Sequence, residues 1–149
     1  MKKLILLITM NLWISQACLA GELDNKIEIT ITNIDKAKRG NLIVFIYKDD
    51  NFPSGEEKAI AIRTLKVHKT TQVVRFSNHD FPDELAFKVL HDEDANEKTT
   101  KNWTGLWPGE GLAFSNSQKL GFLGAPNFDE AKITKKKYSA GITLSLEYP

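Results

Sequence analysis

The chain of 149 residues has little of what most enzyme sites are built from: one cysteine, Cys18, and three scattered histidines, His68, His79 and His91. A domain that begins after Cys18 has no disulfide, no thiolate nucleophile and no cysteine metal site. Three histidines far apart in the sequence give no sign of the convergent ligands of a zinc centre. No H-E-x-x-H, G-x-S-x-G or phosphate-loop spacing occurs either. The sequence therefore carries no motif of a conventional enzyme.

The chain also lacks an excess of either charge. It has 20 Lys and Arg against 19 Asp and Glu, and the formal net charge is +1. Without Lys2 and Lys3, which lie in the N-terminal segment, 18 basic residues remain against the same 19 acidic ones. Proteins that neutralise nucleic-acid phosphates or bind anionic membrane surfaces carry clustered basic residues. We therefore expect no nucleic-acid partner and no polybasic membrane contact.

The longest mostly apolar run lies at the N-terminus. Lys2 and Lys3 precede the run 4–14, and small residues follow at positions 17, 18 and 20. A positive start, a short apolar stretch and a small-residue site are typical of a secretory signal peptide. The run is too short and wrongly flanked for a stable membrane span. The sequence predicts a signal peptide at 1–20 and no membrane-spanning segment.

Cleavage after Ala20 would leave a mature domain at 21–149, located in the periplasm or secreted. Lipoprotein processing at Cys18 is the alternative, because Cys18 follows a short Ser-Gln-Ala segment. A typical lipobox has Leu where this chain has Ser15, so the motif is incomplete. Processing after Ala20 is the interpretation we prefer.

Beyond residue 20 the hydrophobic period is two, which indicates strands. Ile27, Ile29 and Ile31 alternate with polar residues, and the apolar run 42–47 is typical of a central strand. Further strand patterns lie at 59–67, 72–76, 85–90, 131–135 and 141–148. About seven strands in one domain, without an amphipathic helix, predict an all-β fold: a single-domain, two-sheet β-sandwich with one long loop.

The long loop runs from Asp92 to Glu130, where strand patterns are almost absent. Structureless loops longer than about 12–15 residues are uncommon in compact domains unless they are functional or packed by their own side chains. Six large apolar residues could fold this loop over one end of the sandwich: Trp103, Leu106, Trp107, Phe114, Phe122 and Phe128. Because large aromatic residues are highly buried on average, we expect both tryptophans to be buried.

The alternative is that the aromatic residues of this loop are exposed and bind a ligand. Exposed large aromatics often mark interaction sites, and a tryptophan face can pack against a sugar ring or a peptide. Trp103, Trp107 and Phe114 are therefore the candidate ligand-binding residues. Tryptophan emission would separate the buried from the exposed arrangement.

At its start the loop places oxygen-bearing side chains at every second position: Asp92, Asp94 and Asn96. Such a run is one way to gather ligands for Ca²⁺, so these three residues are the candidate metal ligands. With Asp92 as the first position of a calcium loop, Glu97 stands where a turn glycine is expected and Trp103 where a bidentate acid is expected. Acids elsewhere in the loop could complete the shell: Glu110, Asp129 or Glu130.

The competing interpretation of the same residues is a surface turn in which the carboxylates of Asp92 and Asp94 accept backbone N–H groups. We favour this capped turn because two elements of the calcium pattern are missing. A hydrolase with His91 as base and Ser115 as nucleophile is a weaker alternative. The adjacent His91 and Asp92 point to opposite faces of a strand, so adjacency does not pair them. We assign no catalytic residue and expect His91 to anchor the loop backbone.

Several segments resemble a known bacterial family. They are the strand 85–91 running into HDEDAN, the FSN at 114–116 and the GAPNFDEA at 124–131. Together with Glu110–Gly111 they are similar to an exported family catalogued as domain of unknown function 2141, from about residue 41 onward. The resemblance implies an immunoglobulin-like or transthyretin-like sandwich and an acidic loop similar to a calcium loop, without an established activity. The chain departs from the family pattern at Glu97 and at Trp107, which looks inserted before Pro108.

Taken together, the sequence predicts an exported, non-enzymatic module that binds a ligand or partner, with calcium as the candidate cofactor. The partner would be an envelope protein, a peptide or a carbohydrate. A structural or assembly role in the cell envelope, through an exposed edge strand, is the alternative.

Overall fold

The structure is a computed structural model that describes residues 26–77, 81–105, 107–121 and 124–149. The predicted signal peptide, with Cys18, lies outside the described residues, as do Leu106 and Phe122. The described strands are β1 (Lys26–Thr32), β2 (Asn41–Tyr47), β3 (Ala61–Lys66), β4 (Gln72–Ser77), β5 (Glu84–Asp92), β6 (Gly111–Phe114), β7 (Ile133–Thr134) and β8 (Ile142–Ser145). The helical segments are η1 (Glu56–Lys58), α1 (Phe128–Ala131) and α2 (Lys135–Ser139).

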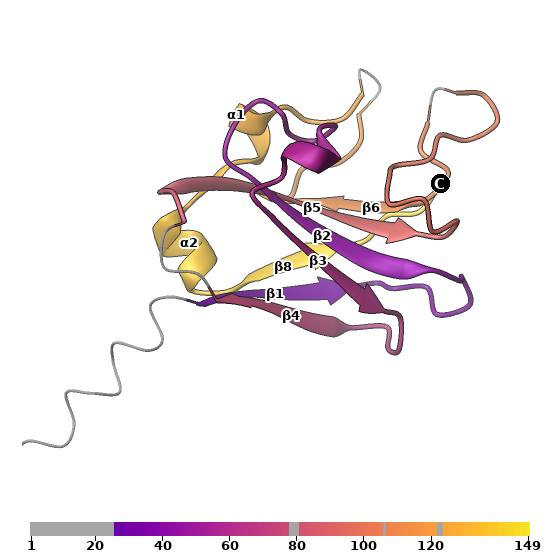
Figure 1. Cartoon of the computed structure of the whole chain (residues 1–149), viewed down its shortest axis with the longest axis horizontal. Helices are drawn as coiled ribbons and strands as arrows, with labels where there is room; N and C mark the ends of the chain where they lie inside the picture. The colour runs from indigo at the N-terminus through magenta and orange to yellow at the C-terminus, as the bar shows by residue number, and fades with distance from the viewer. Residues whose placement is uncertain (1–25, 78–80, 106, 122–123) are drawn as a thin grey trace, which may run out of the picture.

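The strands form two stacked sheets, so the predicted all-β sandwich is confirmed (Figure 1). The smaller sheet has the order β4-β1-β8, with β1 antiparallel to β4 and parallel to β8. The larger sheet has the order β3-β2-β5-β6, and β7 pairs with the beginning of β5. The two faces that meet bury a core of aliphatic residues from both sheets.

The smaller sheet buries one face only, as its sequence alternation predicts. Ile27, Ile29 and Ile31 of β1 are at most 2% exposed and point into the core. The residues between them lie on the outer face, where Thr30 pairs with Val73 of β4 and Thr143 of β8. Alternation of apolar and polar residues with a period of two thus corresponds to a strand that is buried on one face.

The larger sheet is buried on both faces along β2 and β5, which explains why these two strands read as continuous apolar runs. Its outer face carries a second core that includes Phe45, Phe114 and Phe128. The β2–β3 connection with η1 and the segment with α1 cover this face (Figure 1). The outer core matters for function because it supports both the acidic loop and the grooves described below.

The structure corrects the sequence analysis between residues 92 and 135. The segment expected to be a structureless loop contains β6, which pairs with β5 through residues 111–114. The expected strand 131–135 is instead the end of α1, the two-residue strand β7 and the start of α2. Asn127 and Glu130 form a reciprocal capping box that starts α1, a signal that the strand interpretation overlooked.

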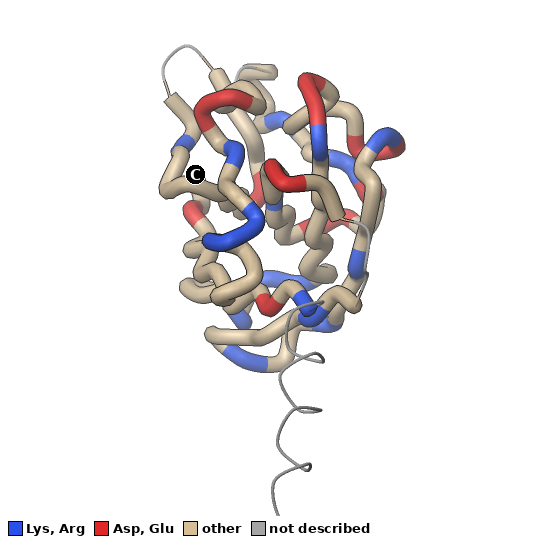
Figure 2. The backbone as a smooth tube through the Cα atoms, turned by 90° about the vertical axis from the view of Figure 1, so that its left-hand side faces the viewer, with Lys and Arg blue, Asp and Glu red and all other residues tan. Residues whose placement is uncertain are grey.

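Charges of both signs are spread along the chain in the view of Figure 2. This distribution agrees with the near-neutral composition. In the part of the chain that the structure describes, no helix is long and apolar enough to cross a membrane.

Candidate cation loop and ligand groove

The acidic loop, defined here as residues 92–110, begins at the last residue of β5. Asp92 pairs with Asn41 of β2 and is completely buried, because β5 lies between two neighbouring strands. Its Oδ1 accepts the N–H of Asn96 and its Oδ2 accepts the N–H of Glu97, both at 3.1 Å. The strand thus delivers a buried carboxylate at the point where the chain turns.

The next residues form the capped turn that the sequence suggests. Asp94 accepts the N–H of Asn96 at 3.1 Å and the hydroxyl of Thr100 at 2.7 Å. Asn96 accepts the N–H of Lys98 through its Oδ1 at 2.7 Å. These bonds hold the loop in one shape, and they leave further lone pairs on each carboxylate.

Glu97 does not prevent the sharp turn that a calcium loop needs. Its φ is 62°, and that of Ala95 is 60°, so two residues other than glycine adopt left-handed backbone conformations. Each such residue costs about 1–2 kcal/mol relative to the right-handed region. The bond from the Glu97 N–H to Asp92 offsets part of this cost. Glu97 thus takes the conformation that a glycine would adopt without this cost.

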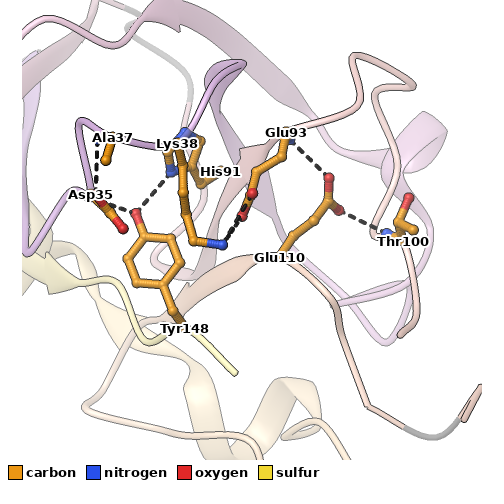
Figure 3. Close-up of polar contacts among 8 residues, drawn as sticks. All are labelled: Asp35, Ala37, Lys38, His91, Glu93, Thr100, Glu110 and Tyr148. Carbon is orange, nitrogen blue, oxygen red and sulfur yellow. Dashed lines mark hydrogen bonds and ion pairs between the residues drawn. The ribbon is translucent and has the colours of Figure 1, made fainter. Parts of the chain in front are cut away.

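Glu110 supplies the acid that the local pattern lacks. It directly precedes β6 and is 4% exposed. Figure 3 shows its carboxylate between two backbone segments, where it accepts the N–H of Glu93 at 2.9 Å and that of Thr100 at 2.8 Å. The other acids considered lie elsewhere: Asp129 pairs with Lys132, and Glu130 caps α1.

Asp92, Asp94 and Glu110 come together as a cluster: one oxygen of each lies within 4.8 Å of the others. Two ligands on opposite sides of a calcium ion, each at about 2.3–2.6 Å, are about 5 Å apart, so this spacing fits a cation among the three. Three carboxylates offer up to six oxygens, the lower limit of what Ca²⁺ needs. Two of the predicted ligands, Asp92 and Asp94, are in this carboxylate cluster; the third, Asn96, lies in the same turn, where its Oδ1 accepts the N–H of Lys98.

The cluster holds negative charge, and none of the ion pairs among the described residues includes one of its members, although the charge of Lys88 interacts with that of Glu110. Burial raises the pKa of Glu110, the N–H groups of Thr100 and Glu93 oppose this rise, and the charges of Asp94 and Asp92 add to it. The described ion pairs of this region join other residues, such as Lys38 to Glu93 at 2.8 Å. Gathering carboxylates at a partly dry site is unfavourable unless a cation compensates them.

His91 anchors the loop from the opposite face of β5. It is completely buried, and its Nδ1 lies 2.8 Å from the hydroxyl of Tyr148 near the C-terminus. That hydroxyl also accepts the N–H of Asp35, so it links the β1–β2 turn to the buried imidazole (Figure 3). The anchor is a tyrosine side chain rather than the loop backbone that we expected.

The stability of the domain should depend on pH through His91. Burial lowers the pKa of His91 below its ordinary value of 6.5, so the unfolded chain takes up a proton at a higher pH than the folded one. Stability should therefore fall as the pH decreases below about 6.5, by up to about 1.4 kcal/mol per pH unit until the folded-state pKa is reached. Urea unfolding between about pH 5.5 and 7.5 measures this slope.

The matched variants for this measurement are His91→Gln and His68→Gln. His68 is exposed, so its replacement should leave the slope unchanged. His91→Gln should flatten it, whatever its effect on the absolute stability. An equal slope in wild type and His91→Gln would contradict the assignment.

Ser115 does not form a pair with His91. Its Oγ accepts the N–H of Phe87 at 2.9 Å and donates to the carbonyl of Ala131 at 2.6 Å, while the residue is 1% exposed. Phe87 lies four residues before His91 on β5, which corresponds to about 13 Å along a strand. The hydrolase arrangement that the sequence allowed is therefore not assembled, and Ser115 ties β5 to the end of α1.

A groove of about 560 Å³ lies beside the acidic loop, between β6 and the C-terminal segment. We call it the aromatic groove; Trp107, Phe114 and Tyr148 line it, together with Glu110 of the carboxylate cluster. Its volume is in the usual range of small-molecule sites, about 300–1,000 Å³. Polar groups for orienting a ligand come from Asn102, Gln118, Ser117, Thr143 and Ser145.

Of the three predicted ligand-binding residues, two line the aromatic groove and one does not. Trp107 is 40% exposed and Phe114 is 5% exposed, and both line the aromatic groove. Trp103 is 96% exposed and lines neither this groove nor the second one described below. The expectation that both tryptophans are buried is wrong, because the loop turns outward at Asn102–Gly105 instead of folding over the sandwich.

Comparison with known proteins adds one relationship. Residues 29–142 match the family described as "Uncharacterized protein conserved in bacteria (DUF2141)". The chain has no match among curated proteins and none among solved structures.

Proposed function

The chain belongs to this bacterial family of uncharacterised proteins, and from that premise we propose that it is an exported, non-enzymatic binding module whose ligand groove is braced by a calcium ion. The observation that carries the proposal is the carboxylate cluster of Asp92, Asp94 and Glu110, two of them buried and none of them in an ion pair among the described residues. Calcium bound there would supply positive charge to these oxygens.

Glu110 is the physical link between the cation loop and the groove. Its carboxylate belongs to the cluster, while the residue itself lines the aromatic groove beside Trp107 and Pro108. Its bonds to Glu93 and Thr100 join both ends of the acidic loop. Whatever fixes the Glu110 carboxylate therefore also fixes one wall of the groove, which lowers the ordering cost of binding a ligand.

Calcium should stabilise the mature domain against unfolding. An ion that binds only the folded state adds about 2.7 kcal/mol at a hundredfold excess over its Kd. Thermal melts in EDTA and then in millimolar Ca²⁺ or Mg²⁺ measure the effect, and we expect a calcium-specific rise of several degrees. Mg²⁺ should act weakly because it demands a small, nearly octahedral shell.

Two variants make the melt specific to the cluster. Glu110→Gln keeps the shape of the side chain and removes its charge, so the calcium shift should be lost. Glu57→Gln removes an exposed acid outside the cluster and should leave the shift intact. A calcium shift that survives Glu110→Gln and Asp92→Ala would overturn the assignment, and no shift in wild type would leave the loop as a capped turn.

Export is the part of the proposal that rests on the N-terminal sequence alone. The basic start, the apolar run 4–14 and the small residues before Gly21 support it. N-terminal sequencing and intact mass of the protein from a bacterial periplasm provide the check. We expect a chain that begins at Gly21; a lipid-modified Cys18 would favour envelope anchoring, and a retained Met1 in the cytoplasm would overturn export.

A structural role in the envelope has its own supporting observation. β3 and β4 are outer strands of their sheets and carry exposed apolar residues, with Ile62 49% and Val73 40% exposed. Outer strands of this kind can pair with another chain. Concentration-dependent self-association that Ile62→Lys abolishes would favour this role over ligand binding.

A further inference from the structure

A second groove, of about 420 Å³, adjoins the aromatic groove. We call it the basic groove, because Lys88, Lys98 and Lys101 line it. The two grooves share four lining residues: Pro108, Leu112, Phe114 and Leu120. One ligand can therefore contact both grooves across this apolar ridge.

Lys88 gives the basic groove a buried positive charge. It lies on the outer face of β5 and is 2% exposed. Its Nζ donates to the carbonyl of Pro53 at 2.8 Å and to Glu56 at 2.7 Å. An ammonium group has three N–H donors, and the described residues accept two of them. The remaining donor is at a desolvated position, where a hydrogen bond to an anion is stronger than in water.

The rim of the groove adds charge that Glu56 does not neutralise. Glu56 is the one acidic residue among those that line the groove, and its carboxylate is already paired with Lys88. Lys98 and Lys101 are exposed, and neither forms an ion pair with the described residues. The groove thus presents about two uncompensated positive charges to an incoming group.

The remaining walls are apolar. Pro53, Leu112, Phe114 and Leu120 supply this apolar lining, with Pro53 and Phe114 next to Lys88 and the other two on the ridge shared with the aromatic groove. A fully hydrated inorganic anion would gain little from such walls, whereas a hydrocarbon stem would bury apolar surface at about 25 cal/mol per Å². The complementary occupant has an anionic group at one end and an apolar body behind it.

We propose that the basic groove binds the carboxylate or phosphate group of an amphipathic small molecule, with its apolar body on the Leu112–Phe114–Leu120 ridge toward Trp107. The proposal rests on the proposed binding role and names its ligand class. It is tested separately from calcium: none of the three lysines belongs to the carboxylate cluster, although the charge of Lys88 interacts with that of Glu110. The anionic group interacts with Lys88, Lys98 and Lys101, and the apolar body carries most of the buried area.

Four probes at constant ionic strength test the ligand class by calorimetry on the mature protein: octanoate, octyl phosphate, octyl glucoside and acetate. Octanoate or octyl phosphate should bind at least about tenfold more tightly than neutral octyl glucoside, and acetate should not bind measurably. The tighter of the two anions identifies the headgroup. Octyl glucoside that binds as well as both anions would overturn the proposal, as would acetate that binds as well as octanoate.

Variants at the rim avoid disturbing the fold. Lys98→Gln with Lys101→Gln should weaken octanoate binding about fivefold, as expected for two partly solvated charge contacts, and leave octyl glucoside unchanged. Lys48→Gln with Lys66→Gln removes two exposed charges outside the grooves and should have no effect. An unchanged octanoate affinity in the Lys98→Gln, Lys101→Gln variant would contradict the proposal.

Trp107→Ala distinguishes the proposed anionic ligand class from ligand binding in general. It should weaken octanoate and octyl glucoside alike, whereas Trp103→Ala should weaken neither, because Trp103 lines neither groove. If Trp107→Ala loses binding but the wild type binds octyl glucoside as tightly as the anions, the binding role would be supported and the anionic ligand class would be overturned. Failure of every probe would overturn the ligand class, while the calcium melts test the cation loop separately.

Discussion

Gly40→Ala should destabilise the domain by about 3 kcal/mol or more, the largest effect of a single methyl group that we expect in this chain. Gly40 has a φ of 108°, in a region that L-residues rarely adopt. A Cβ there would lie 1.9 Å from the carbonyl oxygen of Asp92 and 2.8 Å from the Cα of Glu93. Both neighbours are backbone atoms at the start of the acidic loop, so no side-chain rotation relieves the overlap. Urea unfolding measures the loss.

Gly124→Ala is the matched control for this prediction. Gly124 has a φ of 115°, close to that of Gly40, but a Cβ there would meet no atom of the described residues, its chain neighbours aside, within 4 Å. The control should therefore cost only the backbone strain, about 1–2 kcal/mol. The difference between the two variants isolates the contact between the β1–β2 turn and the acidic loop. Equal losses would mean that this contact is looser than the structure has it.

The same contact explains why a basic turn precedes a buried strand here. Lys38 reaches Glu93 at 2.8 Å, and Gly40 lets the backbone pass close to Asp92. The turn therefore packs on the first two acids of the loop and holds them at the end of β5. If the calcium proposal is correct, Gly40→Ala should also weaken the calcium shift, because it displaces Asp92.

The larger strands could be predicted from sequence because their burial sets the hydrophobic pattern directly. A strand that is buried on one face, such as β1, alternates, and one that is buried on both, such as β2, is apolar throughout. β6 was missed because its four residues, Gly111–Phe114, are too few to show a period. All four are buried because β5 pairs on one side, Leu112 and Phe114 lie in the outer core, and Ala113 lies in the core between the sheets. None of these neighbours is visible in the local sequence.

The candidate site was predictable in part for a similar reason. The alternating acids at 92 and 94 lie within one turn, so their proximity follows from the sequence alone. Glu110 joins them only because β6 returns antiparallel to β5 and brings the end of the loop back to its start. The left-handed turn at Glu97 was unpredictable because its compensation comes from the buried Asp92 carboxylate, which requires the strand to be in place.

Glu56→Gln should cost about 3–5 kcal/mol, because it leaves the ammonium of Lys88 buried without a carboxylate. The pair has an N–O distance of 2.7 Å, and the Lys88 side chain is 3% exposed. Glu28→Gln is the matched control, since the pair of Glu28 with Arg75 has the same distance but is 48% and 62% exposed. An exposed pair contributes at most about 1 kcal/mol, so the control should lose little. Urea unfolding at pH 7 compares the two.

Lys88→Met tests the pair from the other side. It leaves Glu56, whose side chain is 15% exposed and which also accepts the hydroxyl of Thr99 at 3.2 Å, so the loss should be smaller than in Glu56→Gln. The double variant removes both charges and should recover much of the stability, because the apolar outer core then surrounds uncharged groups. Additive losses in the double-mutant cycle would show that the pair is not coupled.

The pH dependence of Glu56→Gln distinguishes a buried charge from a general packing defect. Burial lowers the pKa of Lys88 from its ordinary value of 10.5, and Glu56 partly opposes this shift. Without Glu56 the folded-state pKa falls further, while the unfolded chain keeps its proton up to about pH 10.5. The stability of Glu56→Gln should therefore rise with pH from the folded-state pKa up to about 10.5, by up to about 1.4 kcal/mol per unit, and this rise should begin at a lower pH than in wild type. A packing defect would lower stability equally at every pH, so a rise that begins at a lower pH identifies Lys88 as a cation that the Glu56 carboxylate stabilises at the edge of the basic groove.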